Sequence, residues 1–184
     1  MSYLYIPFTD REGNQDLRRL AGLWVSRVAQ DSRHKNPPEI KIHGSMPRVL
    51  CEVQASESLY ILAHGGDGGY VFNNSVPPAS GMDHRELALR VFRDELSLGH
   101  RKVKLYFCNP LGGAIAEFAR RFKEEMWQLN YTGALEVYYY VGNVSVPRED
   151  DPGVYYKTSS RAPTAFDMTG KAHAGRASTM RQRA

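Results

Sequence analysis

Two residues of this sequence are of types that perform covalent catalysis, and each directly follows a short apolar run. His64 follows Ser58–Ala63, and Cys108 follows Val103–Phe107. Uninterrupted apolar runs of this length are typical of strands that are buried on both faces of a parallel sheet. The two residues are 44 positions apart, which leaves room for one helix and one strand between them. Because functional groups collect where parallel strands end, we expect the imidazole and the thiol to face each other across one cleft.

A neighbouring thiol and imidazole are suited to acyl transfer, in which the sulfur attacks a carbonyl carbon and the imidazole protonates the leaving group. Gly65 lets the chain turn directly after His64, so that its N–H group can point into the cleft. With the N–H group of Cys108, it would form an oxyanion hole of two donors. Gly112 and Gly113 precede a predicted helix whose positive N-terminal end favours the thiolate.

The other cysteine, Cys51, lies in the middle of Val49–Val53, which we predict to be a strand. No glycine-rich loop follows it, and we expect a core or partly exposed thiol. Two cysteines cannot form a disulfide framework, and neither has a histidine at the spacing of zinc ligands. The sequence therefore predicts no metal and no cofactor.

The remaining periodic segments supply the elements that must position these residues. Apolar residues at spacings of three and four predict helices over about 15–30 and 115–129. Asp83-His84-Arg85-Glu86 has the form of a capping box and predicts a helix from there to about Leu98, ended by Gly99. Strands are predicted at 3–8, 40–42, 49–53, 58–63, 103–107 and 135–141. Strands that alternate with helices predict a three-layer α/β/α domain with a mainly parallel sheet over residues 1–147.

Composition and charge exclude several classes of protein. The chain has 184 residues, of which 42% are hydrophobic and 24% charged, as in a globular domain with a core. No run approaches the roughly 18 to 20 apolar residues of a membrane span, and no signal peptide is evident, so we expect a cytoplasmic protein or one exported by another route. Lys157 and the residues after it carry a net charge of +5 and those before it −1. We therefore expect 148–184 to be a basic, largely disordered tail and do not favour nucleic-acid binding.

The order of these segments resembles the caspase-like cysteine peptidases, a group that includes caspases, gingipains, separase and the self-cleaving domains of bacterial toxins. The matching segments are Tyr60–Gly66 and Lys104–Cys108, and the resemblance extends over about 59–141. It implies a caspase-like fold, a polypeptide substrate, Cys108 as nucleophile and His64 as the donor of a proton to the departing amine. It also implies that Gly65 and Cys108 hold the oxyanion. Phe107 departs from the family, whose members have a small residue there, and Gly112 follows the cysteine at a greater distance.

Two other functions use the same residues differently. A thiol-dependent amidase or deamidase, such as some bacterial effectors, would act on a Gln or Asn side chain through the same acyl chemistry. A caspase-like module without activity would bind a partner, and the bulky Phe107 favours this alternative. A Gly-x-Ser-x-Gly nucleophile of the α/β-hydrolases is absent from the sequence, and no Lys-Ser/Thr pair follows Gly65–Gly69 as a phosphate-binding loop requires. The sequence leaves the substrate and the oligomeric state open.

Overall fold

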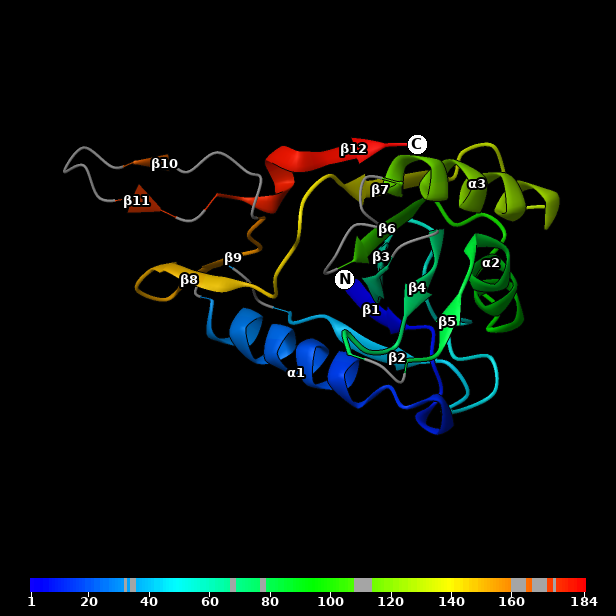
Figure 1. The fold of residues 1–184 in the computed structure, drawn as a ribbon, viewed down its shortest axis with the longest axis horizontal. Coiled ribbons are helices and arrows are strands. Elements are labelled where there is room, and N and C mark those ends of the chain that lie inside the picture. Colours follow the sequence, from blue (N-terminus) through cyan, green and yellow to red (C-terminus); the bar gives the residue numbers. More distant parts are fainter. Residues whose placement is uncertain are drawn as a thin grey trace.

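The computed structural model describes residues 1–31, 33, 36–66, 69–76, 79–107, 114–159, 165–166, 172–173 and 175–184. Its central sheet has the strand order β12-β7-β6-β3-β1-β2 (Figure 1). These strands are β1 Ser2–Ile6, β2 Glu39–Ile42, β3 Ser58–Gly65, β6 Lys102–Phe107, β7 Glu136–Tyr140 and β12 Arg181–Arg183. All neighbours in this order are parallel except β12, which is antiparallel to β7. The chain therefore has a mixed α/β fold with a largely parallel central sheet.

Three α-helices pack against this sheet in the described part of the chain. They are α1 Gln15–Gln30, α2 His84–Arg93 and α3 Ile115–Gln128. Tyr106 of β6 packs on Trp24 of α1, and the next residue, Phe107, packs on Phe118 of α3. Because successive side chains of a strand point to opposite faces, α1 lies on one face of the sheet and α3 on the other, with α2 beside α3 (Figure 1). No described helix combines the length and apolar character of a membrane span.

Two short strands, β4 and β5, extend the sheet at the end of β3. Further short strands follow β7 along the chain. β4 Val71–Phe72 pairs with the end of β3, and β5 Gly81–Met82 pairs with β4. β8 Arg148–Asp151 and β9 Val154–Tyr156 form one antiparallel pair, and β10 Ala165–Phe166 and β11 Ala172–His173 form another. Short 3-10 helices cover Asp10–Glu12 and Ala177–Met180.

Two predicted elements are wrong. Residues 49–53 form turns instead of a strand, with Arg48 in the left-handed region at φ 58°. Val49, Leu50 and Val53 are buried, and this spacing does not alternate as a strand requires. Helix α2 ends at Arg93, not near Leu98 as predicted.

The early end of α2 coincides with a contact to β1 and with a change of backbone conformation. The Asp94 carboxylate accepts a hydrogen bond from the Tyr5 hydroxyl at 2.7 Å, and Glu95 adopts a left-handed conformation at φ 59°. Leu96 is nevertheless buried, and its N–H group donates to the carbonyl of Val91. The apolar spacing therefore continues beyond the point at which the backbone leaves the helix.

The central sheet also continues beyond residue 147, where the sequence prediction ended the domain. Arg181 pairs with Tyr140 and Arg183 with Tyr138. An edge strand is held by backbone hydrogen bonds, so the exposed polar segment of β12 needs no apolar pattern to join the sheet. The prediction of a largely disordered 148–184 tail falls partly on residues outside the described ranges, but β12 belongs to the sheet.

Candidate functional site

His64 lies at the carboxyl end of β3 and points toward α1. Its Nε2 atom is 2.8 Å from Oδ2 of Asp16, and the residue is only 6% exposed. A carboxylate can only accept a hydrogen bond, so the proton of the neutral imidazole belongs on Nε2. Nδ1 then carries a lone pair, and no described residue donates a hydrogen bond to it. The sequence predicted the place of His64 but not its acidic partner.

The pKa values of this pair keep Asp16 ionised and favour a neutral imidazole. Burial lowers the pKa of His64, and the charge and hydrogen bond of Asp16 oppose that effect only in part. Burial alone would raise the pKa of Asp16, but hydrogen bonds from Arg19 and His64 and the charges of both groups lower it. Arg19 reaches the second carboxylate oxygen, with Nη2 2.7 Å from Oδ1. The histidine is therefore in the state that can accept a proton.

Gly65 does not turn the chain directly after His64, contrary to the prediction. It remains in β3 and pairs with Val71 of β4. The N–H group of Gly66 donates to the carbonyl of Tyr70 at 3.1 Å, toward β4. Successive N–H groups of a strand point to opposite sides, so the N–H group of Gly65 points away from β4. β4 is on the side of β1, because Asn73 binds the turn after β1, and Gly65 therefore directs its N–H group toward the side of β6.

At the end of β3, the residue that must be a glycine is Gly66, because its backbone lies against the Phe72 ring. A Cβ atom built there would lie 2.3 Å from the Phe72 ring, and one at Gly81 would lie 2.6 Å from the same ring. Such distances are shorter than any real contact, so both backbones approach the ring more closely than a side chain would permit. The two glycines hold the β4–β5 hairpin tightly against the end of β3.

Cys108, Gly112 and Gly113 lie outside the described residues. The last described residue before them, Phe107, pairs with Ala63 in the parallel register of β6 and β3. The Phe107 ring contacts Phe118 on the α3 face, while His64 binds Asp16 on the α1 face. The bulky Phe107 side chain thus leaves the face of His64 free.

Cys51 is exposed, in a turn. The predicted mid-strand position is wrong, because the backbone around it forms consecutive tight turns, with the N–H group of Cys51 donating to the carbonyl of Arg48. Its thiol is accessible to solvent and lacks a histidine partner among the described residues. Cys51 would therefore also be modified in a thiol-labelling experiment.

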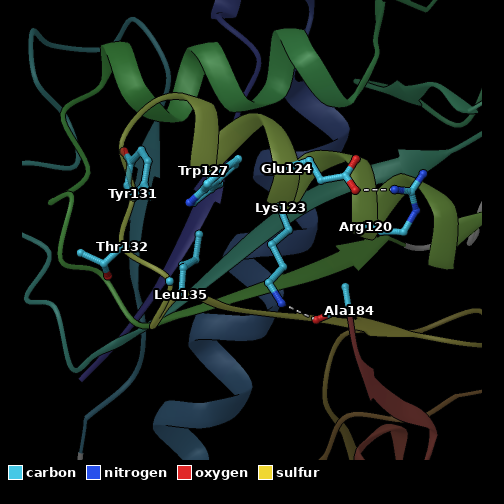
Figure 2. Close-up of a pocket in the computed structure, with 9 residues that line it drawn as sticks. Arg120, Lys123, Glu124, Trp127, Tyr131, Thr132, Leu135 and Ala184 are labelled. Carbon is cyan, nitrogen blue, oxygen red and sulfur yellow. Dashed lines mark hydrogen bonds and ion pairs between the residues drawn. The ribbon is translucent and has the colours of Figure 1, made fainter.

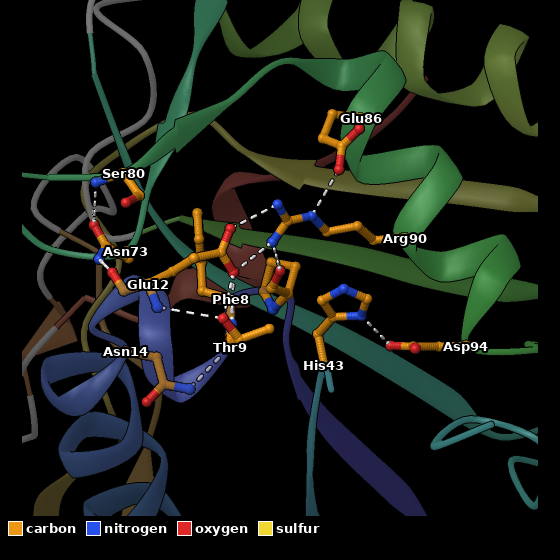
Figure 3. Close-up of polar contacts among 11 residues, drawn as sticks. Phe8, Thr9, Glu12, Asn14, His43, Asn73, Ser80, Glu86, Arg90 and Asp94 are labelled. Carbon is orange, nitrogen blue, oxygen red and sulfur yellow. Dashed lines mark hydrogen bonds and ion pairs between the residues drawn. The ribbon is translucent and has the colours of Figure 1, made fainter. Parts of the chain in front are cut away.

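A polar cluster fixes the turn that leads into α1 (Figure 3). Arg90 of α2 binds both carboxylate oxygens of Glu12, at 2.7 and 2.9 Å, and donates to the carbonyl of Pro7 at 2.7 Å. The N–H group of Thr9 also donates to Glu12, at 2.7 Å. Burial alone would raise the pKa of Glu12, but hydrogen bonds from Arg90 and Thr9 and the charge of Arg90 lower it to about 2. The turn is therefore held by an ionised pair at neutral pH.

Asn73 connects this turn to the β4–β5 hairpin. Its amide Nδ2 donates to the carbonyls of Glu12 and Gly13, and its Oδ1 accepts from the N–H group of Ser80 at 2.8 Å. The side chain is buried, and Figure 3 shows it between Glu12 and Ser80. Asp16 and the hairpin beside His64 are thus positioned by one network. Sequence reasoning missed this network, although Thr9-Asp-Arg-Glu12 has the capping-box spacing that could have indicated its centre.

Two hollows lie at opposite ends of α3. One, of about 400 Å³, is lined by Tyr70, Asp83, His84 and the first turn of α3, close to the end of β3. The other, of about 310 Å³, lies between the last turns of α3 and the C-terminal residue (Figure 2). There Lys123 donates to Ala184 at 2.7 Å, Arg120 pairs with Glu124, and Trp127 is 70% exposed. No cluster of potential metal ligands occurs among the described residues.

Comparison with known proteins adds no relative. No protein-family model, curated protein or solved structure matches this chain. The fold and the arrangement around His64 are the grounds on which a function can be argued.

Proposed function

We propose that this protein is a cysteine peptidase of the caspase-like type, with a three-layer α/β/α core and a Cys108–His64 dyad. The observation that supports it best is the pairing of Ala63 with Phe107, the residues that directly precede His64 and Cys108. One peptide bond beyond this pair, the imidazole and the thiol would meet at the same edge of the sheet. The substrate would be a polypeptide, either another protein or this chain itself.

His64 acts first as a base in the proposed reaction. Its neutral imidazole accepts the proton of the Cys108 thiol, and the sulfur attacks the peptide carbonyl carbon to form a C–S bond. The C–N bond then breaks, His64 gives its proton to the departing amine, and a thioester remains. Water attacks the thioester with His64 again as base, the C–S bond breaks, and the sulfur recovers the proton.

Asp16 and Gly65 have supporting roles in this reaction. Asp16 is a positioning residue, because it holds the imidazole by Nε2 and stabilises the imidazolium that forms when the thiol loses its proton. The N–H group of Gly65, directed toward the side of β6, is suited to bind the oxyanion. The hollow beside Tyr70 and His84 lies next to this edge and has room for a substrate side chain.

The test uses the full chain with Cys51→Ser, because the exposed Cys51 thiol would react in its own right. We expect iodoacetamide at pH 7 to alkylate Cys108 at least about tenfold faster in the folded chain than in the urea-unfolded chain, since an activated thiol ionises more readily. Mass spectrometry after incubation with an unfolded protein should show cut chains. A further Cys108→Ala substitution should abolish the cutting.

The outcomes separate the alternatives. Cutting that persists without Cys108 would contradict the proposal. An amide-to-acid mass change in the substrate without a cut would indicate the thiol-dependent deamidase instead. Slow alkylation together with an unchanged substrate would indicate a binding module that lacks activity.

A further inference from the structure

Lys157, which follows β9, occupies an unusual place for a lysine. Its Nζ atom is 2.7 Å from the Tyr60 hydroxyl and lies over two aromatic rings, 4.2 Å from the centroid of Tyr60 and 5.0 Å from that of Trp24. Lys104 reaches the same hydroxyl, with its Nζ atom at 2.9 Å. Neither ammonium group forms an ion pair with a described carboxylate. Two lysines therefore share one phenol on the α1 face of the sheet.

This lysine also lines a hollow of about 330 Å³ that opens between α1 and the β8–β9 hairpin. Trp24 and Tyr60 contribute aromatic rings to the wall, and Arg176 contributes a guanidinium group. The guanidinium of Arg33 also lines the hollow but is already paired with the buried Asp31 carboxylate, at 2.6 and 2.9 Å. Both guanidinium groups stack on the Tyr156 ring, with their Cζ atoms 4.2 and 3.8 Å from its centroid. No carboxylate lines the hollow among the described residues. An aromatic wall, an amine and the guanidinium group of Arg176 thus meet around one space.

The surroundings of Lys157 favour its neutral, nucleophilic form. Burial, with a smaller effect from the charge of Arg181, lowers the pKa of Lys157 to about 8. Burial also lowers the pKa of Lys104, to which Lys157 and Arg181 add their repulsion. A pKa near 8 leaves about a quarter of the amine unprotonated at pH 7.5, against about one part in a thousand for an ordinary lysine.

We propose that Lys157 is the nucleophilic amine of a binding site for small aldehydes that carry a carboxylate or a phosphate. The oxyanion would bind the guanidinium group of Arg176, which matches both anions in shape and charge. The carbonyl would then lie against Lys157 and Tyr60. This site surrounds Tyr60, which lies on the same face of β3 as His64 but earlier in the strand, and the inference does not depend on the peptidase.

The reaction is an imine condensation. The neutral Nζ atom attacks the aldehyde carbon, a C–N bond forms, and the carbonyl oxygen takes up a proton. The resulting carbinolamine loses that oxygen as water, which carries away both hydrogens of the amine, and a C=N bond remains. The Tyr60 hydroxyl, which already contacts the nitrogen, can donate a proton to the departing oxygen and recover one from the amine.

The test traps the imine by reduction. The full chain is incubated at pH 7.5 with glyoxylate or with pyridoxal 5′-phosphate, reduced with borohydride, digested and mapped by mass spectrometry. We expect Lys157 to be modified at least about tenfold faster than Lys102, and Lys157→Arg to lose that fast modification while its circular dichroism stays unchanged. The relative rates with the two probes show whether the site prefers a carboxylate or a phosphate.

A second variant tests the anion part of the site. Arg176→Gln should slow the reaction with both anionic probes several-fold and leave the reaction with uncharged pyridoxal unchanged. The proposal is overturned if Lys157 reacts no faster than Lys102. It is also overturned if pyridoxal and pyridoxal 5′-phosphate modify Lys157 at the same rate in the unsubstituted chain.

Discussion

Two histidine–aspartate pairs lie at the carboxyl ends of parallel strands in this protein, and their surroundings differ. His64, in β3, binds Asp16 at 2.8 Å, and His43, directly after β2, binds Asp94 at 2.9 Å (Figure 3). The Asp94 oxygen that accepts from His43 also accepts from the buried hydroxyl of Tyr5. Asp16 lies instead in the first turn of α1, is partly exposed and binds Arg19.

The difference shows that the same pair of side chains can serve structure or chemistry according to its neighbours. The Asp94 pair joins β1, the end of β2 and the end of α2, and it lies on the outer side of the sheet. The Asp16 pair lies over the central strand, beside the strand that leads to Cys108. We therefore assign stability to His43–Asp94 and the proposed chemistry to His64–Asp16.

The largest effect expected from this assignment is on activity. In the Cys51→Ser chain, His64→Gln should slow proteolysis at neutral pH by at least about a hundredfold, because general acid–base catalysis contributes about that much or more. It should also lower the alkylation rate of Cys108 to about that of the unfolded chain, because the thiol is no longer activated. Peptide mapping of the alkylated chain at timed intervals measures the second rate.

His43→Gln is the matched control for that experiment, since it removes a histidine with the same kind of partner. It should change the activity of the folded protein by less than about threefold. Equal losses in the two variants would refute the assignment of the chemistry to His64.

The next effect is on stability, and here the larger loss is expected for the His43–Asp94 pair. Asp94→Ala leaves the buried Tyr5 hydroxyl without its acceptor, and we expect the free energy of unfolding to fall by about 1 to 3 kcal/mol. Asp16→Ala removes a partly exposed carboxylate and should cost less than about 1 kcal/mol. Thermal unfolding followed by circular dichroism should show a melting temperature about 5 to 10 °C lower for Asp94→Ala than for the unsubstituted chain. A larger loss for Asp16→Ala would reverse the comparison.

The strands and helices of the core could be predicted from the sequence. The buried strands before His64 and Cys108 were predictable, because continuous apolar runs have few other structures available to them. The mainly parallel sheet and the helices over about 15–30 and 115–129 followed from the spacing of apolar residues and are confirmed, with the second helix ending at Gln128.

Partners distant in the chain were not predictable. Asp16 is 48 positions from His64, and Arg90 is 78 from Glu12, so each contact depends on how the helices are placed over the sheet. The end of α2 was missed for the same reason, because Asp94 binds Tyr5, which lies 89 positions earlier in the chain. β12 was missed because backbone pairing at a sheet edge leaves no mark on side-chain pattern.

The smallest expected effect is on the titration of His64. Burial lowers its pKa below 6.5, and the charge and hydrogen bond of Asp16 are the two contributions that raise it. Asp16→Asn removes the charge, so the imidazole should bind its proton at a still lower pH. Two-dimensional NMR of the imidazole protons should therefore place the midpoint of His64 below that of an exposed histidine, and lower again in Asp16→Asn. Asp10→Asn, which alters an exposed carboxylate paired with Arg18 near the same helix, should leave the midpoint where it is. A midpoint that rises in Asp16→Asn would mean that the carboxylate does not stabilise the imidazolium, and the positioning role of Asp16 would be lost.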